Sequence, residues 1–350
     1  MHPYKSLPPH CFWRNAVAGV APEDVDPVVR PKFRITREDK VATAGSCFAQ
    51  HIARHLHGSG FNYFVTETAH PVLHGAAVEP FGYGLFTARY GNIYTARQLR
   101  QLLSRAYGEF VPMDDVWPRE DGRLIDPFRP QIQPDGFASR REYEADRSQH
   151  FAAIRRAIEE LDVFVFTLGL TEAWMSKADG AIYPLCPGVA GGTYDPDQHV
   201  FVNFSADDVI GDMSAAITYI LKRNPAARFI LTVSPVPLVA TFEDRSALVS
   251  TTYSKSVLRV ACEELSRHER VAYFPSYEII TGNFSRGAYF AKDLRSVNET
   301  GVNHVMRLFM KHYASDAPQQ KPVVVSTQSS FIEQMEDAVA VVCDEEALAR

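Results

Sequence analysis

The sequence predicts an α/β fold, a three-layer sandwich with a central parallel sheet of about five strands, long loops and a C-terminal helix. Two observations predict it: short apolar runs of strand length, and segments of helical periodicity between them. The runs are rich in β-branched, aromatic or small apolar residues, as strands buried on both faces are. They occupy residues 40–44, 61–65, 163–167, 229–233 and 271–274.

Helical periodicity fills the spaces between these runs. In each segment apolar residues recur every three or four positions, which places them on one face of a helix. The segments span residues 48–56, 95–107, 142–161, 206–222, 254–267 and 298–313. Because strands and helices alternate, the strands should be parallel and the helices should cover both faces of the sheet.

The chain divides into three parts by composition. Residues 1–35 are proline-rich and irregular and predict an N-terminal arm, and residues 36–315 form the main domain. Two aperiodic insertions, 108–140 and 175–204, are long enough to be walls of a binding cleft. Residues 316–350 are a polar linker and a C-terminal helix, which offers a docking element for a second copy or another partner.

Composition excludes several classes of protein. The net charge is −6 and no dense basic cluster occurs, which argues against a nucleic-acid partner. No apolar run is long enough for membrane insertion, and residues 1–15 do not read as a secretory signal. The five cysteines are scattered and form no CxxC pair, so we expect reduced thiols, a cytoplasmic location and no structural zinc.

The most informative segment is Gly45-Ser46-Cys47-Phe48-Ala49, because it joins the first predicted strand to the first predicted helix. Glycine allows a sharp backbone bend there, and the hydroxyl and thiol that follow stand at a helix N-terminus. The helix dipole stabilises a thiolate or a developing oxyanion, so we expect an exposed, reactive Cys47. The competing interpretation is an ordinary helix cap followed by a buried cysteine.

Polar residues also follow the other strands, where ligands of open α/β sheets bind. Gly169, Thr171, Glu172 and Trp174 come after the third predicted strand. Thr171 would donate to an oxyanion and Glu172 would orient a base, although an ordinary turn at the strand end explains both equally well. Trp174, with Tyr183 and Tyr194 in or beside the second insertion, could stack on a sugar ring. The alternative, which we favour slightly, is that these aromatics pack the insertion onto the domain.

With these residues in view, the chain resembles the GSCFA family, named for the pentapeptide at 45–49, which is itself similar to SGNH/GDSL esterases and acyltransferases. The resemblance covers about residues 35–315 and implies an SGNH- or flavodoxin-like sandwich. Further motifs that carry it are residues 89–95, 167–172, 234–237, 254–256 and 273–278.

The resemblance also implies roles for individual residues. By spacing, Cys47 takes the place of the SGNH nucleophile and Ser46 the place of the preceding aspartate. Gly91, next to Asn92, matches the glycine whose N–H binds the oxyanion. The segment beginning at Gly169 matches the block that carries a second oxyanion donor, with Thr171 in place of an asparagine.

The last SGNH block matches residues 293–301. Asp293 is retained there, but the histidine of the family pattern is replaced by Ser296. A thiol depends on a base less than a hydroxyl does, which favours Cys47 over Ser46 as nucleophile.

Several histidines are alternatives for the missing base. His51 lies one helical turn after Cys47, His304 is on the last helix of the domain, and His70 and His74 lie in the loop after the second predicted strand. Each also has a structural interpretation, as a solvated, packed or turn residue. A metal site at Cys47, His51 and His55 lacks an evident fourth ligand, so we expect no metal.

The sequence therefore predicts an SGNH-like acyl-ester hydrolase or O-acyltransferase that acts on a carbohydrate or another small acylated substrate through a Cys/Ser nucleophile. No nucleotide-binding motif occurs and no cofactor is expected. The alternative is a protein that binds a glycan or acyl ligand without turnover, because the SGNH histidine is lost.

Overall fold

The computed structural model describes residues 2–72, 78–315 and 343–349. The chain forms two compact units. The larger one contains Glu38–Tyr273 together with Val341–Arg350, and the smaller one contains Met1–Arg37 and Phe274–Ala340. Each unit therefore combines two segments that are far apart in the sequence.

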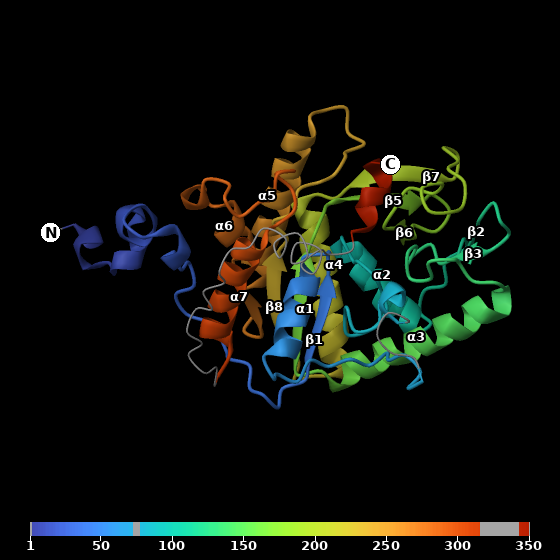
Figure 1. The fold of residues 1–350 in the computed structure, drawn as a ribbon, viewed down its shortest axis with the longest axis horizontal. Helices are drawn as coiled ribbons and strands as arrows, with labels where there is room; N and C mark the ends of the chain where they lie inside the picture. Colours follow the sequence, from blue (N-terminus) through green and yellow to red (C-terminus); the bar gives the residue numbers. More distant parts are fainter. Residues whose placement is uncertain (1, 73–77, 316–342, 350) are drawn as a thin grey trace, which may run out of the picture. The chain divides into compact units, whose positions relative to one another are not determined.

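The core of the larger unit is a parallel four-stranded sheet, flanked by helices (Figure 1). Its order is β1-β4-β8-β9, with all three neighbouring pairs parallel. The strands are β1 (Val41–Gly45), β4 (Val163–Leu168), β8 (Arg228–Val233) and β9 (Val271–Tyr273). Every residue of β1 and β4 is buried, which explains why both read as continuous apolar runs. The predicted α/β sandwich is confirmed.

The second predicted strand, residues 61–65, is described by the structure but is not a strand. Residues 61–65 lie beside β1, but only an isolated parallel bridge joins Val41 to Tyr63. The N–H of Tyr63 bonds back to Phe61 O at 2.8 Å, so the run bends on itself and cannot extend a ladder. The apolar and aromatic pattern of 61–65 therefore reflects burial at the sheet edge.

In the described part of the larger unit five α-helices accompany the sheet, and each covers a segment with predicted helical periodicity. They are α1 (Ala49–Gly58), α2 (Ala96–Ala106), α3 (Arg140–Glu160), α4 (Ala206–Arg223) and α5 (Ala247–Leu265). Hydroxyl side chains accept from backbone N–H groups at three of the N-termini: Thr95 caps α2, Ser139 caps α3 and Ser205 caps α4. The start of α5 is seven residues earlier than predicted.

The insertion at 175–204 is not an aperiodic loop, as the sequence suggested. Together with β5 (Glu172–Ser176) it forms an antiparallel sheet in the order β6-β5-β7, where β6 is Ile182–Tyr183 and β7 is His199–Asn203. The other insertion contains a two-stranded pair, β2 (Trp117–Pro118) and β3 (Leu124–Ile125). Strands of two to five residues are too short to show an alternating pattern.

The two insertions share one apolar cluster of Trp117, Ile125, Ala181 and Tyr183. Tyr183 is fully buried there, so it is a core residue and does not present its ring to a ligand. Of the two interpretations of Tyr183, packing of the insertion is the one that the structure supports, because its ring lies 5.1 Å from that of Trp117.

The smaller unit contains α6 (Ser276–Thr281) and α7 (Glu299–Tyr313). Ile35 and Ala314 form a parallel bridge, and His304 of α7 contacts Val25, so the second half of the arm packs against α7. Residues 2–19 of the arm form short 3-10 and π turns and are largely exposed.

Most of the predicted C-terminal helix lies outside the described residues. Its described end is a 3-10 helix, Asp344–Ala349, in the larger unit. None of the helices in the described ranges combines the length and apolar character that a bilayer-spanning segment requires.

Candidate functional site

The turn between β1 and α1 can only be built with glycine at its start. Gly45 has φ +133°, and a Cβ there would lie 2.3 Å from Thr167 O. Ser46 N donates to the same Thr167 O at 3.0 Å, which fixes the turn against the end of β4. The sequence signal of a glycine at the strand end therefore has a steric cause.

Ser46 and Cys47 occupy this turn, immediately before α1 begins. Their backbone carbonyls accept from Ala49 N and Gln50 N. Cys47 is only 1% exposed and Ser46 only 2%, so the prediction of an exposed thiol is wrong. The Ser46 hydroxyl is buried and has no hydrogen-bond partner among the described residues. An unpaired buried hydroxyl is costly, which marks this turn as unusual.

The loop Gly91–Tyr94 runs between the ends of β1 and β4. Ile93 N donates to Gly45 O at 2.8 Å, and Gly169 N donates to Tyr94 O at 3.0 Å. Gly169 packs so closely that a Cβ on it would lie 2.8 Å from the Ser46 Cβ. The structure thus brings together Ser46, Cys47, Gly169 and the loop, at the carboxyl edge of the sheet.

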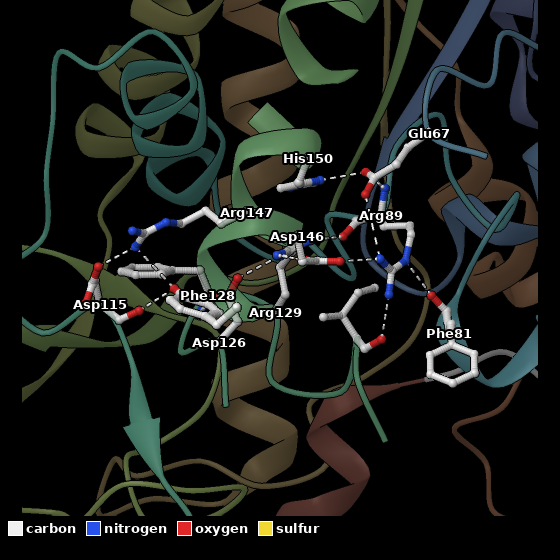
Figure 2. A network of polar contacts seen from close by, with 12 residues as sticks. Glu67, Phe81, Arg89, Asp115, Asp126, Phe128, Arg129, Asp146, Arg147 and His150 are labelled. Atoms are coloured by element: carbon white, nitrogen blue, oxygen red, sulfur yellow. Dashed lines mark hydrogen bonds and ion pairs between the residues drawn. The ribbon is translucent and has the colours of Figure 1, made fainter. Parts of the chain in front are cut away.

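A network of buried charges anchors this loop (Figure 2). The Arg89 guanidinium donates to Phe81 O, to Ile132 O and to Asp146 of α3. The Arg89 backbone is held as well, because its N–H donates to Glu67 at 2.8 Å and its carbonyl accepts from Arg129. Charged side chains therefore fix the chain two residues before Gly91.

Glu67 is the anionic centre of one half of the network. His150 Nδ1 lies 2.7 Å from its carboxylate, which accepts, so Nδ1 carries the proton. Burial raises the pKa of Glu67, but the hydrogen bond from His150 and the charge of Arg129 outweigh it and lower the pKa to about 2. Burial, with the charge of Arg129, lowers the pKa of His150. Glu67 is thus ionised and His150 neutral.

Asn92, in the anchored loop, binds a carboxylate of the chain itself. Its Nδ2 donates to Asp344 at 3.0 Å, and its backbone N–H also donates to this carboxylate. Gln50 of α1 donates to Asn92 Oδ1 at 3.4 Å. Asn92 was predicted as an oxyanion- or substrate-binding residue, and here two of its N–H groups donate to one carboxylate.

Tyr94 completes this group, and sequence analysis did not single it out. Its hydroxyl accepts from Asp344 N at 2.9 Å. Burial raises the pKa of Tyr94 well above its ordinary value, and the nearby acidic groups Asp344, Glu345, Cys47 and Cys343 raise it further. Tyr94 is therefore a protonated phenol with Cys47 and the C-terminal segment as neighbours. Its place in the motif 89–95 was the available signal.

The residues after β4 have structural partners. The Thr171 hydroxyl is buried and donates to Asn203 at 2.7 Å, while Glu172 accepts from Thr241 at 2.7 Å. Burial raises the pKa of Glu172. Lys255 of α5 is buried as well, and its ammonium donates to Gly169 O at 2.7 Å.

The next question is which histidine could serve the nucleophile turn as a base. Among the described residues, no imidazole hydrogen-bonds to Ser46 or Cys47. His51 is buried with its ring 5.4 Å from Phe48, and burial with the charge of Arg54 lowers its pKa to about 4. His70 is exposed and accepts from Val72 N. His74 lies outside the described residues.

Asp293 and His304 belong to the smaller unit. Asp293 is exposed and accepts from the Ser296 hydroxyl at 2.6 Å, so serine occupies the position of the expected histidine and bonds to the same carboxylate. His304 has both ring nitrogens engaged, one by Tyr289 at 2.8 Å and one by Val25 O at 3.0 Å. Because a carbonyl only accepts, His304 Nε2 carries the proton.

An aromatic cluster lies on the small sheet. Trp174 packs on Phe242 at 4.9 Å, on Tyr194 at 5.3 Å and on Phe201 at 5.9 Å. Phe242 is 64% exposed and Tyr194 is 41% exposed. Two of the three aromatics expected to contact a sugar are thus in contact with each other near the surface.

Two further observations limit the site. No group of three or more His, Cys, Asp or Glu side chains in the described ranges is arranged to hold a metal ion, and this includes Cys47, His51 and His55. A cavity of about 570 Å³ is lined by residues of α2 and α3 and of the loop after α2, including Arg105, Arg147 and Arg155. None of the predicted site residues lines it.

Comparison with protein-family models identifies the GSCFA family. The model of the GSCFA family covers residues 40–309, which include the turn after β1, the loop Gly91–Tyr94 and all four strands of the parallel sheet. No curated protein matches the chain.

Proposed function

The chain belongs to the GSCFA family, and we propose that it is an acyl-transfer enzyme, an ester hydrolase or O-acyltransferase with Cys47 as nucleophile. One observation carries the proposal: two N–H groups of Asn92 converge on a carboxylate next to the Tyr94 hydroxyl, which also has Cys47 as a neighbour. Donors arranged in this way suit the oxyanion of a tetrahedral intermediate.

The proposed reaction has two steps. The Cys47 sulfur bonds to the acyl carbonyl carbon, the ester C–O bond breaks, and the released alcohol takes up the proton that the thiol gives away. Water or a sugar hydroxyl then attacks the thioester, gives its proton back to the sulfur and releases the acyl product. Asn92 would stabilise both oxyanions, and the protonated Tyr94 is a further donor.

For the substrate we propose a carbohydrate or another small acylated molecule. The support is the cluster of Trp174, Tyr194 and Phe242 on the small sheet, since apolar sugar faces pack well on exposed aromatic rings. A reducing compartment, the cytoplasm, fits the five free cysteines.

A second candidate function is binding without turnover. The observation that favours it is the missing imidazole, because no histidine of the described residues hydrogen-bonds to Cys47 or Ser46. Ser296 also stands where the SGNH pattern, which the chain resembles, has histidine. Such a protein would keep the Asn92 donors for a ligand and leave Cys47 unreacted.

The test is acylation by p-nitrophenyl butyrate, followed by intact mass and peptide mapping. We expect a butyryl adduct on Cys47, and a loss of turnover of at least about a hundredfold in Cys47→Ala. Cys186→Ala is the matched control, because burial raises the pKa of that thiol to about 11 and it should keep full turnover.

The result also separates the alternatives. An adduct on Ser46 that persists in Cys47→Ala would move the nucleophile by one residue. No adduct on either residue, in a protein with an unchanged circular dichroism spectrum, would overturn the enzyme proposal and leave the binding function.

A further inference from the structure

The loop that carries Asn92 and Tyr94 is occupied by a segment from the far end of the chain. Asp344 lies 252 positions after Asn92, yet Asn92 Nδ2 donates to its carboxylate and Tyr94 accepts from its backbone N–H. Cys343, Asp344 and Glu345 are all buried. In Figure 1 this segment is the red 3-10 helix marked C.

Asn92 and Tyr94 contact both the side chain and the backbone of Asp344. Asn92 donates two hydrogen bonds to the Asp344 carboxylate, and the Tyr94 hydroxyl accepts one from the backbone N–H of Asp344. Asn92 is in turn bonded by Gln50, and its loop is anchored through Arg89. A side-chain carboxyl group and the adjoining peptide N–H are therefore recognised together.

We propose that Asn92 and Tyr94 form a recognition site for a carboxyl-bearing, peptide-like group, and that Asp344 of the chain's own C-terminal segment is its intramolecular ligand. The segment Cys343–Glu345 then closes the nucleophile turn, and it must leave before another carboxyl-bearing ligand can enter. This inference goes beyond the proposed function, since occupancy of the site does not require Cys47 to react.

The docked segment is sensitive to pH. Burial raises the pKa of Asp344 to about 6, although the bonds from Asn92 lower it. Within the described ranges, the titratable groups that act on the Tyr94 hydroxyl beside this carboxyl are Asp344 itself, Glu345, Cys47 and Cys343. None of these is a cation. A group with a raised pKa in the docked state favours docking at low pH, and this contribution is lost as pH rises through about 6.

Cysteine labelling tests the proposal in the full-length protein. After treatment with N-ethylmaleimide, peptide mass spectrometry gives the rates at Cys343, at the exposed Cys11 and at the buried Cys262. We expect slow labelling of Cys343 in the wild type. In Asp344→Lys an unpaired cation would be buried between Asn92 and Tyr94, so the segment should leave and Cys343 should react at least about tenfold faster.

Glu346→Lys is the matched control, because it makes the same charge change at an exposed position and should leave Cys343 protected. Continued protection of Cys262 shows that each variant is folded. An unchanged Cys343 rate in Asp344→Lys, or an equal increase in Glu346→Lys, would overturn the proposal.

The pH dependence gives a second readout. From pH 5 to pH 8 the ratio of the Cys343 rate to the Cys11 rate should rise about tenfold in the wild type, as docking weakens. Asp344→Asn should abolish this rise, because the amide does not titrate. A wild-type ratio that falls or stays constant would contradict the assignment of Asp344 as the ligand. Maleimide labelling involves no acyl transfer, so a failure of the proposed function would not alter either result.

Discussion

At the scale of single residues, the geometry of the nucleophile turn depends on two glycines. Gly45 has a backbone conformation that side chains rarely adopt, and Gly169 leaves no room for a Cβ against Ser46. Between them they allow the ends of β1 and β4 to approach the loop Gly91–Tyr94. Replacing either glycine with alanine would push the ends of β1 and β4 away from the loop Gly91–Tyr94.

Gly45→Ala tests this point. The added Cβ would lie 2.3 Å from Thr167 O at φ +133°, so we expect a loss of at least about 2 kcal/mol in the free energy of unfolding. Urea unfolding followed by circular dichroism measures it. A variant as stable as the wild type would show that the turn adopts another conformation.

At the scale of elements, α4 contains a glycine that its packing does not require. Gly211 lies within α4, is exposed, and has nothing within 4 Å of an added Cβ. At this position glycine only increases the conformational entropy of the unfolded chain, which destabilises the fold. The helix has no steric reason to keep it.

We therefore expect Gly211→Ala to stabilise the protein by about 0.5–1 kcal/mol, because alanine has the higher helix propensity. The same urea experiment as for Gly45→Ala applies, and the two variants are expected to have opposite signs. A destabilised Gly211→Ala would mean that this face of α4 is covered by another molecule in solution.

At the scale of the whole molecule, the buried network of Figure 2 couples α3, the first insertion and the site loop. Glu67 has a lowered pKa of about 2 in the folded state, against an ordinary value of 4.5. A lowered pKa contributes stability above the ordinary value, and this contribution disappears as pH falls toward 2. The shift corresponds to about 3 kcal/mol.

Glu67→Gln should therefore be less stable than the wild type at pH 7, by about 3 kcal/mol, with the difference shrinking between pH 4.5 and pH 2. Denaturant midpoints over this pH range measure it. Parallel curves for the two proteins at all pH values would contradict the assignment of Glu67 as an ionised group of the network.

Local signals in the sequence were enough for most of the fold. Four of the five predicted strands form the parallel sheet, and six helical patterns became helices, because consecutive residues encode these periods. The strand predicted at 61–65 was wrong, because a segment buried at the edge of a sheet can be apolar without forming the hydrogen bonds of a strand. The small antiparallel sheet was missed because its strands are too short for a period to emerge.

For the site, the sequence alone determined the strand–glycine–helix turn at Gly45, the family and the gathering of residues at one sheet edge. Only the tertiary structure decided that Cys47 is buried, that no described imidazole bonds to it, and that Asp344 lies on Asn92. The physical reason is the separation in sequence between the residues that interact. A turn is encoded by neighbouring residues, whereas the contact between Asn92 and Asp344 exists only once segments 252 positions apart have packed together.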